Sequence, residues 1–439
     1  MTDRVLCYPA VPSIIVNGGR PLSGSVAASG SKNASLPVLA ACLLNDQPVV
    51  LENVPRLHDV EIICEVLRAL GATISPVPRD HERSIDSSSV NSTEPPYELV
   101  RQMRASFLVL GPLLARFHEA SVPLPGGCNI GPRPVNEHLS ALEALGAEIV
   151  QESGRIVARA DRLVGTEISM NIVSVGATEN AVMAASLAEG VTTIYNASSD
   201  PDVVDLCDFL IACGVGIEGA GTKKLVIHGQ EQISRAVSYR VSPDRIEAGT
   251  FLLALAATGG DGIVRNVEPE HLEPLLHKLQ SCGIELEIGD DTIRVVGNGP
   301  FRATNIETAP HPGFPTDLQP QMSVLLSAAD GVSTVTEHIF EKRLSHVPEL
   351  MRMGAKMQVH GESIFIEGQR GALAGVPVEA HDLRCAAALV IAGLMASGET
   401  RIDGLEHLVR GYEALPDKMS QLGGDVRFDL DHETAAATG

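Results

Sequence analysis

Hydrophobic and polar positions recur along this 439-residue chain with a nearly constant period. Six segments have the pattern of an apolar helix end, a glycine and a short strand, and consecutive first glycines lie 68 to 75 residues apart. A helix end often needs a left-handed residue, a conformation that costs glycine little. We therefore predict six structural units of about 70 residues. The six segments are VLRALGATI (66–74), ALEALGAEI (141–149), FLIACGVGI (209–217), KLQSCGIEL (278–286), LMRMGAKMQ (350–358) and KMSQLGGDV (418–426).

A second pattern recurs with the same period: a helix of small residues, a turn and a β-branched strand. It is found at 183–197, 252–267, 325–339 and 392–405, with a weaker copy at 39–54. Because these helices are rich in Ala and Leu on more than one face, we expect them to be buried between sheets. A unit of this size buries apolar surface poorly alone, whereas stacked copies share a core. The sequence thus predicts an α/β protein of two domains with three units each.

The expected boundaries are turn-rich segments that lack the repeat pattern. These are ASGSKNAS around Lys32 and YRVSPDRIE around Asp244. We predict a first domain of residues 32–242 and a second domain of residues 1–31 plus 243–439. If a strand at 14–18 pairs with the C-terminal half, the chain crosses twice between the domains. Ligand sites favour domain interfaces, so we expect the active site in the cleft between them.

Composition and charge narrow the classes of function. The net charge is −22, and only seven of the 33 basic residues are Lys. This balance argues against nucleic acid or an anionic membrane as the main partner, although a local basic cluster can still bind a small anion. The longest apolar run is too short to span a bilayer, and the N-terminus lacks a signal-peptide core. We expect a cytoplasmic protein.

A glycine-rich loop carries the sharpest chemical signal. In LPGGCNIGPRPVNEHL (124–139), Cys128 is displayed five residues before Arg133. A thiol in a polar loop near a guanidinium has a lowered pKa and can act as an acid or a nucleophile. The alternative is an incidental loop cysteine. We expect the other seven cysteines to be small buried hydrophobes in a reducing compartment.

Two further segments place a charge at a turn. Lys32 opens an apolar helix, where free N–H groups and an ammonium suit a phosphate or carboxylate, unless it is a solvated surface lysine. Asp317 follows two prolines in HPGFPTDLQPQ and is either a helix N-cap or a positioned base. No metal-ligand spacing or dinucleotide fingerprint is present. Further guanidinium groups, each also compatible with a surface ion pair, come from Arg104, Arg343, Arg384 next to Asp382, and Arg410.

These motifs resemble the enolpyruvyl transferase family over almost the whole chain. The resemblance implies an inside-out α/β barrel with six repeats in two pseudo-threefold domains. It implies transfer of the enolpyruvyl group of phosphoenolpyruvate to the 3-hydroxyl of UDP-N-acetylglucosamine, the first committed step of peptidoglycan synthesis, with no metal or organic cofactor. It also implies a cysteine loop that is the target of fosfomycin. The resemblance rests on SGSKNASLPVLAA, MRASFLVLGPLLARF, LPGGCNIGPRPVNEHL, VSVGATEN, SPDRIEAGTF, APHPGFPTDLQPQ, RLSHVPELMRMGA, DLRCAAALV and RGYE.

The resemblance also implies roles for individual residues. Cys128 matches the acid that protonates the methylene carbon of phosphoenolpyruvate, and Asp317 matches the residue that takes the proton from the sugar hydroxyl. The implied contacts of phosphoenolpyruvate are Lys32, Asn33, Arg133 and Arg410. The implied contacts of the nucleotide sugar are Arg104, Arg133, Pro134, Val135, Asn136, Glu137, Ser174, Val175, Gly176, Asp317 and Ile339. The implied supporting residues are Arg343, Asp382 and Arg384.

The sequence departs from the usual family pattern at His58, Ile172, Lys342 and Val409, while Lys32, Cys128 and Asp317 are all present. The departures leave two alternative acceptors open: another uridine nucleotide and shikimate phosphate. A rival of another class is an inactive repeat protein that binds nucleotide sugars.

Two segments fall outside this scheme. We expect 83–96 to be an exposed loop, and the acidic tail from Asp429 onward to be disordered.

Overall fold

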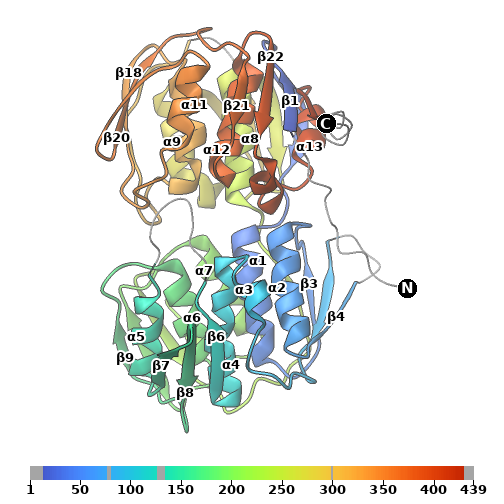
Figure 1. The fold of residues 1–439 in the computed structure, drawn as a ribbon, viewed down its shortest axis with the longest axis vertical. Coiled ribbons are helices and arrows are strands. Elements are labelled where there is room, and N and C mark those ends of the chain that lie inside the picture. The colour runs from blue at the N-terminus through green and yellow to red at the C-terminus, as the bar shows by residue number, and fades with distance from the viewer. Residues whose placement is uncertain (1–12, 77–80, 126–133, 298–299, 430–439) are drawn as a thin grey trace.

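The protein consists of mixed α/β elements in two lobes. The computed structural model describes residues 13–76, 81–125, 134–297 and 300–429. Figure 1 shows the lobes one above the other along the longest axis. We call the part from α1 to β13 the first lobe, and β1, β2 and everything from α8 to β23 the second lobe. Buried hydrophobic residues form two separate clusters, one within 34–241 and one within 14–28 and 246–426.

The described strands of the first lobe form three sheets. The first has the order β13-β3-β5-β4, the second β6-β8-β7 and the third β11-β12-β10-β9. The strands are β3 (Val49–Glu52), β4 (Thr73–Pro76), β5 (Arg83–Asp86), β6 (Glu119–Pro123), β7 (Glu148–Glu152), β8 (Arg155–Arg159), β9 (Glu167–Ser169), β10 (Val191–Tyr195), β11 (Gly216–Glu218), β12 (Lys224–His228) and β13 (Val237–Arg240).

The described strands of the second lobe also form three sheets, with the orders β15-β16-β14-β2, β17-β18-β20-β19 and β21-β22-β1-β23. β1 lies between β22 and β23 and is antiparallel to both, so the expected pairing of the N-terminal strand with the C-terminal half is confirmed. The strands are β1 (Ser13–Asn17), β2 (Ser23–Ala27), β14 (Asp261–Arg265), β15 (Glu285–Ile288), β16 (Thr292–Val296), β17 (Ile306–Glu307), β18 (Gly331–Thr336), β19 (Lys356–His360), β20 (Ser363–Gly368), β21 (Pro377–Glu379), β22 (Glu399–Asp403) and β23 (Asp425–Asp429).

Five of these six sheets share one pairing pattern. A parallel pair is followed by two antiparallel pairings, as in β9‖β10, then β10 with β12, then β12 with β11. The exception is the three-stranded sheet, which holds only the antiparallel part. One face of each strand is therefore free to pack on helices while the other meets solvent.

Helices fill the interior of each lobe. The first lobe contains α1 (Lys32–Ala41), α2 (His58–Ala69), α3 (Tyr97–Val100), α4 (Leu110–Phe117), α5 (Asn136–Ala144), α6 (Val175–Ala185) and α7 (Pro201–Ala212), with 3₁₀ helices η1 (Cys42–Leu44) and η2 (Arg104–Val109). The second lobe contains α8 (Arg245–Thr258), α9 (Glu273–Ser281), α10 (Gln319–Leu326), α11 (His346–Arg352), α12 (Leu383–Met395) and α13 (Leu415–Gln421), with η3 (Pro269–Leu272), η4 (Thr316–Leu318) and η5 (Leu405–Arg410).

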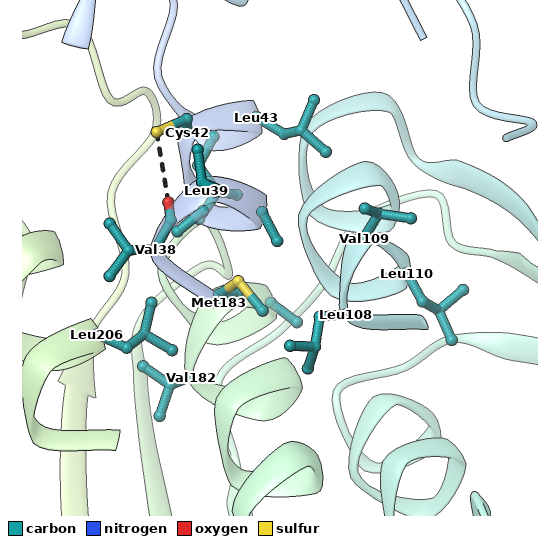
Figure 2. Packing of buried hydrophobic residues seen from close by; sticks show 14 of the residues in the cluster. Val38, Leu39, Cys42, Leu43, Leu108, Val109, Leu110, Val182, Met183 and Leu206 are labelled. Carbon is teal, nitrogen blue, oxygen red and sulfur yellow. Dashed lines mark hydrogen bonds between the residues drawn. The ribbon is translucent and has the colours of Figure 1, made fainter. Parts of the chain in front are cut away.

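The helices of small apolar residues are buried, as predicted. Nearly every residue of α8 and α12 is shielded from solvent. Figure 2 shows the equivalent packing in the first lobe, where Val38 and Leu39 of α1 meet Val182 and Met183 of α6. The Cys42 thiol donates to the carbonyl of Val38 over 3.3 Å instead of facing solvent. Among the described residues, no helix has both the length and the apolar character needed to cross a membrane.

The six predicted turn glycines all have positive φ, between 77° at Gly423 and 109° at Gly354. After each glycine, the next amide donates to the carbonyl five residues earlier, for example from Ala72 to Leu67 over 3.0 Å. This bond satisfies a carbonyl that the helix end leaves free. The prediction of left-handed residues at these helix ends is confirmed.

The expectations for the segment 83–96, for the cysteines and for the C-terminal tail have different outcomes. The segment 83–96 was expected to be an exposed loop, which is wrong for its start: Arg83–Asp86 are strand β5, paired with β3 and β4. Ile85 explains this, because its side chain is buried in the first lobe. The six described cysteines are all buried, as expected, and Cys7 and Cys128 lie outside the described residues. The tail beyond Asp429 also lies outside them.

The turn glycines allow a matched test of folding energetics. Gly71 and Gly214 have nearly equal φ values of 106° and 104°, but a Cβ at Gly71 would lie 2.9 Å from the Ser89 carbonyl oxygen, whereas at Gly214 it would meet nothing within 4 Å. We expect Gly214→Ala to lower the free energy of unfolding by about 1 kcal/mol through backbone strain alone, and Gly71→Ala to lower it further. Urea denaturation of both variants measures the difference. Equal losses would contradict the steric term.

Candidate active site between the lobes

Lys32 stands where the two lobes meet. It is the first residue of α1, whose N-cap Ser31 accepts a hydrogen bond from the backbone of Ala34 over 3.1 Å. The backbone N–H of Lys32 donates to Asp244 Oδ2 over 3.2 Å. Asp244 also caps α8 of the second lobe, accepting from the backbone N–H of Ile246. The Lys32 side chain is only 12% exposed, so the alternative of a solvated surface lysine is wrong.

A first group of charges forms around Asp59 at the start of α2. Lys32 Nζ lies 3.7 Å from Asp59 Oδ2, and Arg410 Nε of the second lobe donates to Asp59 Oδ1 over 2.9 Å. Arg410 Nη2 also approaches the carbonyl of Gln102 at 3.4 Å. One buried carboxylate therefore links two cations from different lobes.

A second group forms around Asp317. Its Oδ1 lies 2.5 Å from Arg343 Nη1, and its Oδ2 lies 2.6 Å from Arg384 Nη2. Both arginine side chains are buried, so the alternative of surface ion pairs is wrong for them. Asp317 sits inside η4 and makes no capping bond to α10, so the N-cap alternative is also wrong.

Electrostatics connect the two groups. Burial raises the pKa of Asp317, but the charges of Arg384 and Arg343, helped by Lys32, outweigh it and hold the pKa well below its usual range. Burial lowers the pKa of Lys32, and the negative charges of Asp59 and Asp317 partly oppose that shift. Lys32 of the first lobe and Asp317 of the second are thus near enough for each to influence the pKa of the other.

Two further carboxylates hold the loops around Asp317. Glu337 accepts from Thr308 Oγ1 (2.9 Å), Thr316 Oγ1 (2.8 Å) and the backbone N–H of Ile339 (2.8 Å). It thereby ties Ile339 to the segment that carries Asp317. Asp382 caps α12 by accepting from the backbone of Arg384 over 2.8 Å. The predicted supporting residues Arg343, Asp382 and Arg384 are thus brought together with Asp317.

Most of the predicted nucleotide-sugar residues lie in the first lobe, at the N-terminal ends of α5 and α6. Asn136 and Val175 are the first residues of these helices, and Ser174 caps α6. Gly176 lies so close to α5 that a Cβ there would be 3.2 Å from the ring of His138. Pro134 accepts from Arg104 Nη2 over 3.1 Å. The structure therefore brings Arg104, Pro134, Val135, Asn136, Glu137, Ser174, Val175 and Gly176 into one region.

Glu137 and Asn33 have different surroundings. The Glu137 carboxylate accepts from the backbone and side chain of Asn171, at 2.9 and 3.1 Å, so it fixes the segment just before α6. Asn33 is half-buried beside Lys32 in the first turn of α1.

Cys128 and Arg133 lie outside the described residues, so their contacts are not part of the geometry above. The described chain reaches this segment through β6 and Leu124, whose backbone N–H donates to Gly154 over 2.9 Å. It resumes at Pro134, next to Arg104. Both ends of the segment therefore belong to the first lobe.

The departures from the family pattern differ in their surroundings, and Lys342 precedes Arg343 of the Asp317 group. Ile172 and Lys342 are exposed, and His58 and Val409 are half-buried next to Asp59 and Arg410 in sequence. Within the described ranges, no cluster of His, Cys, Asp and Glu side chains could hold a metal ion.

Sequence reasoning missed several residues of this region. Asp59 lies in the first turn of a helix, where an acidic residue is common and gives no sign of a partner in the other lobe. Glu337 lies in the repeated segment 325–339, and Tyr412 lies in the motif RGYE. Only their contacts in the structure mark them as part of this region. Asp244 was placed at a domain boundary, and its position before an apolar helix was an available N-cap signal.

Comparison with known proteins now identifies the family. The sequence profile of EPSP synthase (3-phosphoshikimate 1-carboxyvinyltransferase) matches residues 16–419. The chain is 52% identical over 414 residues to the UDP-N-acetylglucosamine 1-carboxyvinyltransferase of Shewanella amazonensis, covering 94% of this chain and 98% of the relative. It is 49% identical over 415 residues to UDP-N-acetylglucosamine 1-carboxyvinyltransferase 1 of Staphylococcus aureus, with the same coverage of both chains.

Solved structures agree with this assignment. The enolpyruvyl transferase NikO from Streptomyces tendae is 27% identical and superposes with a TM-score of 0.86 over 95% of this chain and 98% of that chain. An EPSP synthase from Acinetobacter baumannii, at 18% identity and a TM-score of 0.74 over 95% of this chain and 99% of that chain, shares the fold. The chain therefore belongs to the EPSP synthase family of enolpyruvyl transferases.

Proposed function

We propose that this protein transfers the enolpyruvyl group of phosphoenolpyruvate to the 3-hydroxyl of UDP-N-acetylglucosamine and releases phosphate. The observation that carries the proposal is a pair of charge groups where the lobes meet: Lys32 and Arg410, one from each lobe, on Asp59, and Asp317 with Arg384. An anionic donor needs the cations, and the attacking hydroxyl needs the carboxylate. Relatives about half identical to this chain carry the name of this activity. The reaction is the first committed step of peptidoglycan synthesis, which we place in the cytoplasm.

The architecture that supports this activity is proposed as two inside-out α/β barrels of three repeats each. The domains are residues 32–242 and residues 1–31 plus 243–439. The shared sheet pattern and the six equivalent helix ends support this division, as do the two separate hydrophobic clusters. The active site lies in the cleft between the domains.

We assign binding roles by charge and position. Lys32, Asn33, Arg133 and Arg410 hold the phosphate and carboxylate of phosphoenolpyruvate, since several rigid cations suit a compact polyanion. The nucleotide sugar lies along the N-terminal ends of α5 and α6, where free backbone N–H groups favour an anionic diphosphate. Its contacts are Arg104, Arg133, Pro134, Val135, Asn136, Glu137, Ser174, Val175, Gly176, Asp317 and Ile339.

The reaction is an addition followed by an elimination. The sugar oxygen bonds to C2 of phosphoenolpyruvate while Asp317 takes its proton, and Cys128 delivers a proton to C3, which becomes a methyl group. The resulting phosphate ketal then loses phosphate, which takes up the proton held by Asp317 as it leaves C2, while the Cys128 thiolate takes a proton back from the methyl carbon, and the double bond is restored in the product. No external oxidant or metal is needed for the balance of atoms and charge.

The observed pairing of Asp317 has a consequence for its role as base. Two arginines hold its pKa low, which keeps the carboxylate ionised but makes it a weak proton acceptor. Lys32 also lowers this pKa, so an anionic donor bound to Lys32 offsets that positive charge and raises the pKa of Asp317. The base therefore becomes stronger as the site fills.

A direct assay tests the function. Purified protein with phosphoenolpyruvate should release inorganic phosphate with UDP-N-acetylglucosamine, and not with UMP or shikimate phosphate in parallel reactions. Asp317→Asn should lower kcat by roughly 10² to 10⁴-fold, because it removes a proton-transfer group. Release with shikimate phosphate or UMP alone would instead identify the alternative acceptor. An inactive protein that still binds the nucleotide sugar would support the non-catalytic rival.

The role of Cys128 is tested with fosfomycin, whose epoxide carbon the thiolate attacks, forming a thioether as the ring oxygen takes up a proton. We expect mass spectrometry to find one adduct, on Cys128, since the six described cysteines are buried. Cys128→Asp should retain activity and resist the drug, because a carboxyl group can still donate the proton. Cys128→Ser serves as the control, because a serine hydroxyl is a much weaker acid than a thiol. An adduct on another cysteine contradicts the assignment.

The charge group around Asp59 predicts a pH effect. Asp59 is the largest influence opposing the burial that lowers the pKa of Lys32, so Asp59→Asn lowers that pKa further. Since protonated Lys32 binds the donor, the alkaline limb of the kcat/KM profile for phosphoenolpyruvate should move to lower pH. The loss of the charged hydrogen bond to Arg410 should also lower kcat/KM on the order of tenfold at neutral pH. Glu65→Gln, on the exposed side of the same helix, is the matched control, and an unmoved limb in Asp59→Asn refutes the coupling.

A further inference from the structure

A buried hydrogen-bond network lies behind the Asp317 group and centres on the hydroxyl of Tyr412. Tyr412 is 3% exposed. Its hydroxyl lies 2.9 Å from Thr250 Oγ1, 3.2 Å from Gln321 Nε2 and 3.2 Å from Arg384 Nη1. These partners come from α8, α10 and α12, the three central helices of the second lobe. None of the roles proposed above uses this hydroxyl.

The direction of each bond follows from the donors available. Thr250 Oγ1 is 2.8 Å from the carbonyl of Ile246, to which its only hydrogen is donated. Thr250 must then accept from the Tyr412 hydroxyl. The lone pairs of the Tyr412 oxygen are left to accept from Arg384 and Gln321, both of which can only donate through these nitrogens.

Arg384 is thereby held at two points of its guanidinium group. Nη1 donates to the Tyr412 oxygen, and Nη2 donates to Asp317 Oδ2 over 2.6 Å. The guanidinium carbon also lies 5.6 Å from the centroid of the Tyr412 ring. Gln321 belongs to the same network, because its Nε2 also donates to the backbone carbonyl of Asp317 over 3.1 Å. We call Tyr412, Arg384 and Gln321 the frame around Asp317.

We propose that Tyr412 is a positioning residue for the reaction: its hydroxyl, oriented by Thr250, fixes the guanidinium of Arg384, which in turn fixes the carboxylate of Asp317. The inference rests on the proposed function, because it assigns Asp317 as the base. A neutral acceptor suits this place, since it holds one arm of Arg384 without competing with Asp317 for the charge.

The test measures whether Tyr412 acts on Asp317 and not only on stability. The charged groups that influence Asp317 are Arg384, Arg343, Lys32 and, from α8, Arg245. Tyr412→Phe removes the acceptor and loosens Arg384, which weakens the stabilisation of the Asp317 carboxylate and raises its pKa. We expect kcat to fall about tenfold, because the loss of a fixed position for the carboxylate outweighs its gain in basicity. The acid limb of the kcat profile should move to higher pH.

Variants of Thr250 test the orientation of the hydroxyl. Thr250→Val removes the acceptor and should lower kcat, as Tyr412→Phe does. Thr250→Ser keeps the oxygen and should retain the kcat of the wild-type protein. Thr250 Oγ1 also accepts from Gln321 Nε2 over 3.2 Å, a contact that does not involve Arg384. The double variant Tyr412→Phe with Thr250→Val should be no slower than Tyr412→Phe alone, because Thr250 acts on Arg384 through a hydroxyl that Phe lacks. Additive losses overturn the proposal.

Tyr239→Phe is the matched control. Tyr239 is a half-buried tyrosine of the first lobe, and its hydroxyl donates to Asp205, whose carboxylate and backbone carbonyl both lie within reach. Its loss should lower the melting temperature and leave both kcat and the acid limb unchanged. If Tyr412→Phe behaves like this control, Tyr412 is merely structural and the proposal fails. Phosphate release by the wild-type protein decides the proposed function separately, since that result does not depend on any Tyr412 variant.

Discussion

The site depends on the ionisation of Asp317, because a carboxylate that is buried away from water stays ionised only where cations lie next to it. Arg343 and Arg384 meet its two oxygens at 2.5 and 2.6 Å. Removing either cation leaves uncompensated charge, which costs several kcal/mol in a buried pair. Each arginine must therefore be held in turn, Arg384 by Tyr412 and Arg343 by Thr316. The carboxylate organises the loops and helix ends around it.

The second lobe cannot complete this arrangement alone. Residues at and just after the end of η5 link it to the first lobe: Arg410 donates to Asp59, and Glu413 accepts from the backbone of Arg56 over 3.1 Å. Tyr412 lies between these two contacts and is anchored in the interior of the second lobe. A short segment therefore connects the frame around Asp317 to the position of the opposite lobe.

The sequence predicted the repeated elements better than the loops between them. Helix ends such as that at Gly71 follow from local sterics, so a pattern of apolar residues and a glycine is sufficient. The segment from Arg83 was misjudged because one buried residue, Ile85, outweighs polar neighbours once it can pair with β3. For the site, unusual residues at turns pointed to Lys32 and Asp317. Asp59, which pairs with Lys32, and Tyr412, which accepts from Arg384, were missed because contacts between distant elements leave no local signal.

Cations around the site form ion pairs with carboxylates of the same chain. Asp59 forms ion pairs with Lys32 and Arg410, and Asp317 forms ion pairs with two arginines. Asp200 pairs with Arg245 at 2.9 Å. A weakly charged ligand cannot compete with these carboxylates at such distances. A polyanion can, because it offers several oxygens to several cations at once and compensates the desolvation of each. These carboxylates therefore favour substrates that carry as much negative charge as phosphoenolpyruvate and a nucleotide diphosphate do, because only such substrates can replace them as partners of the cations.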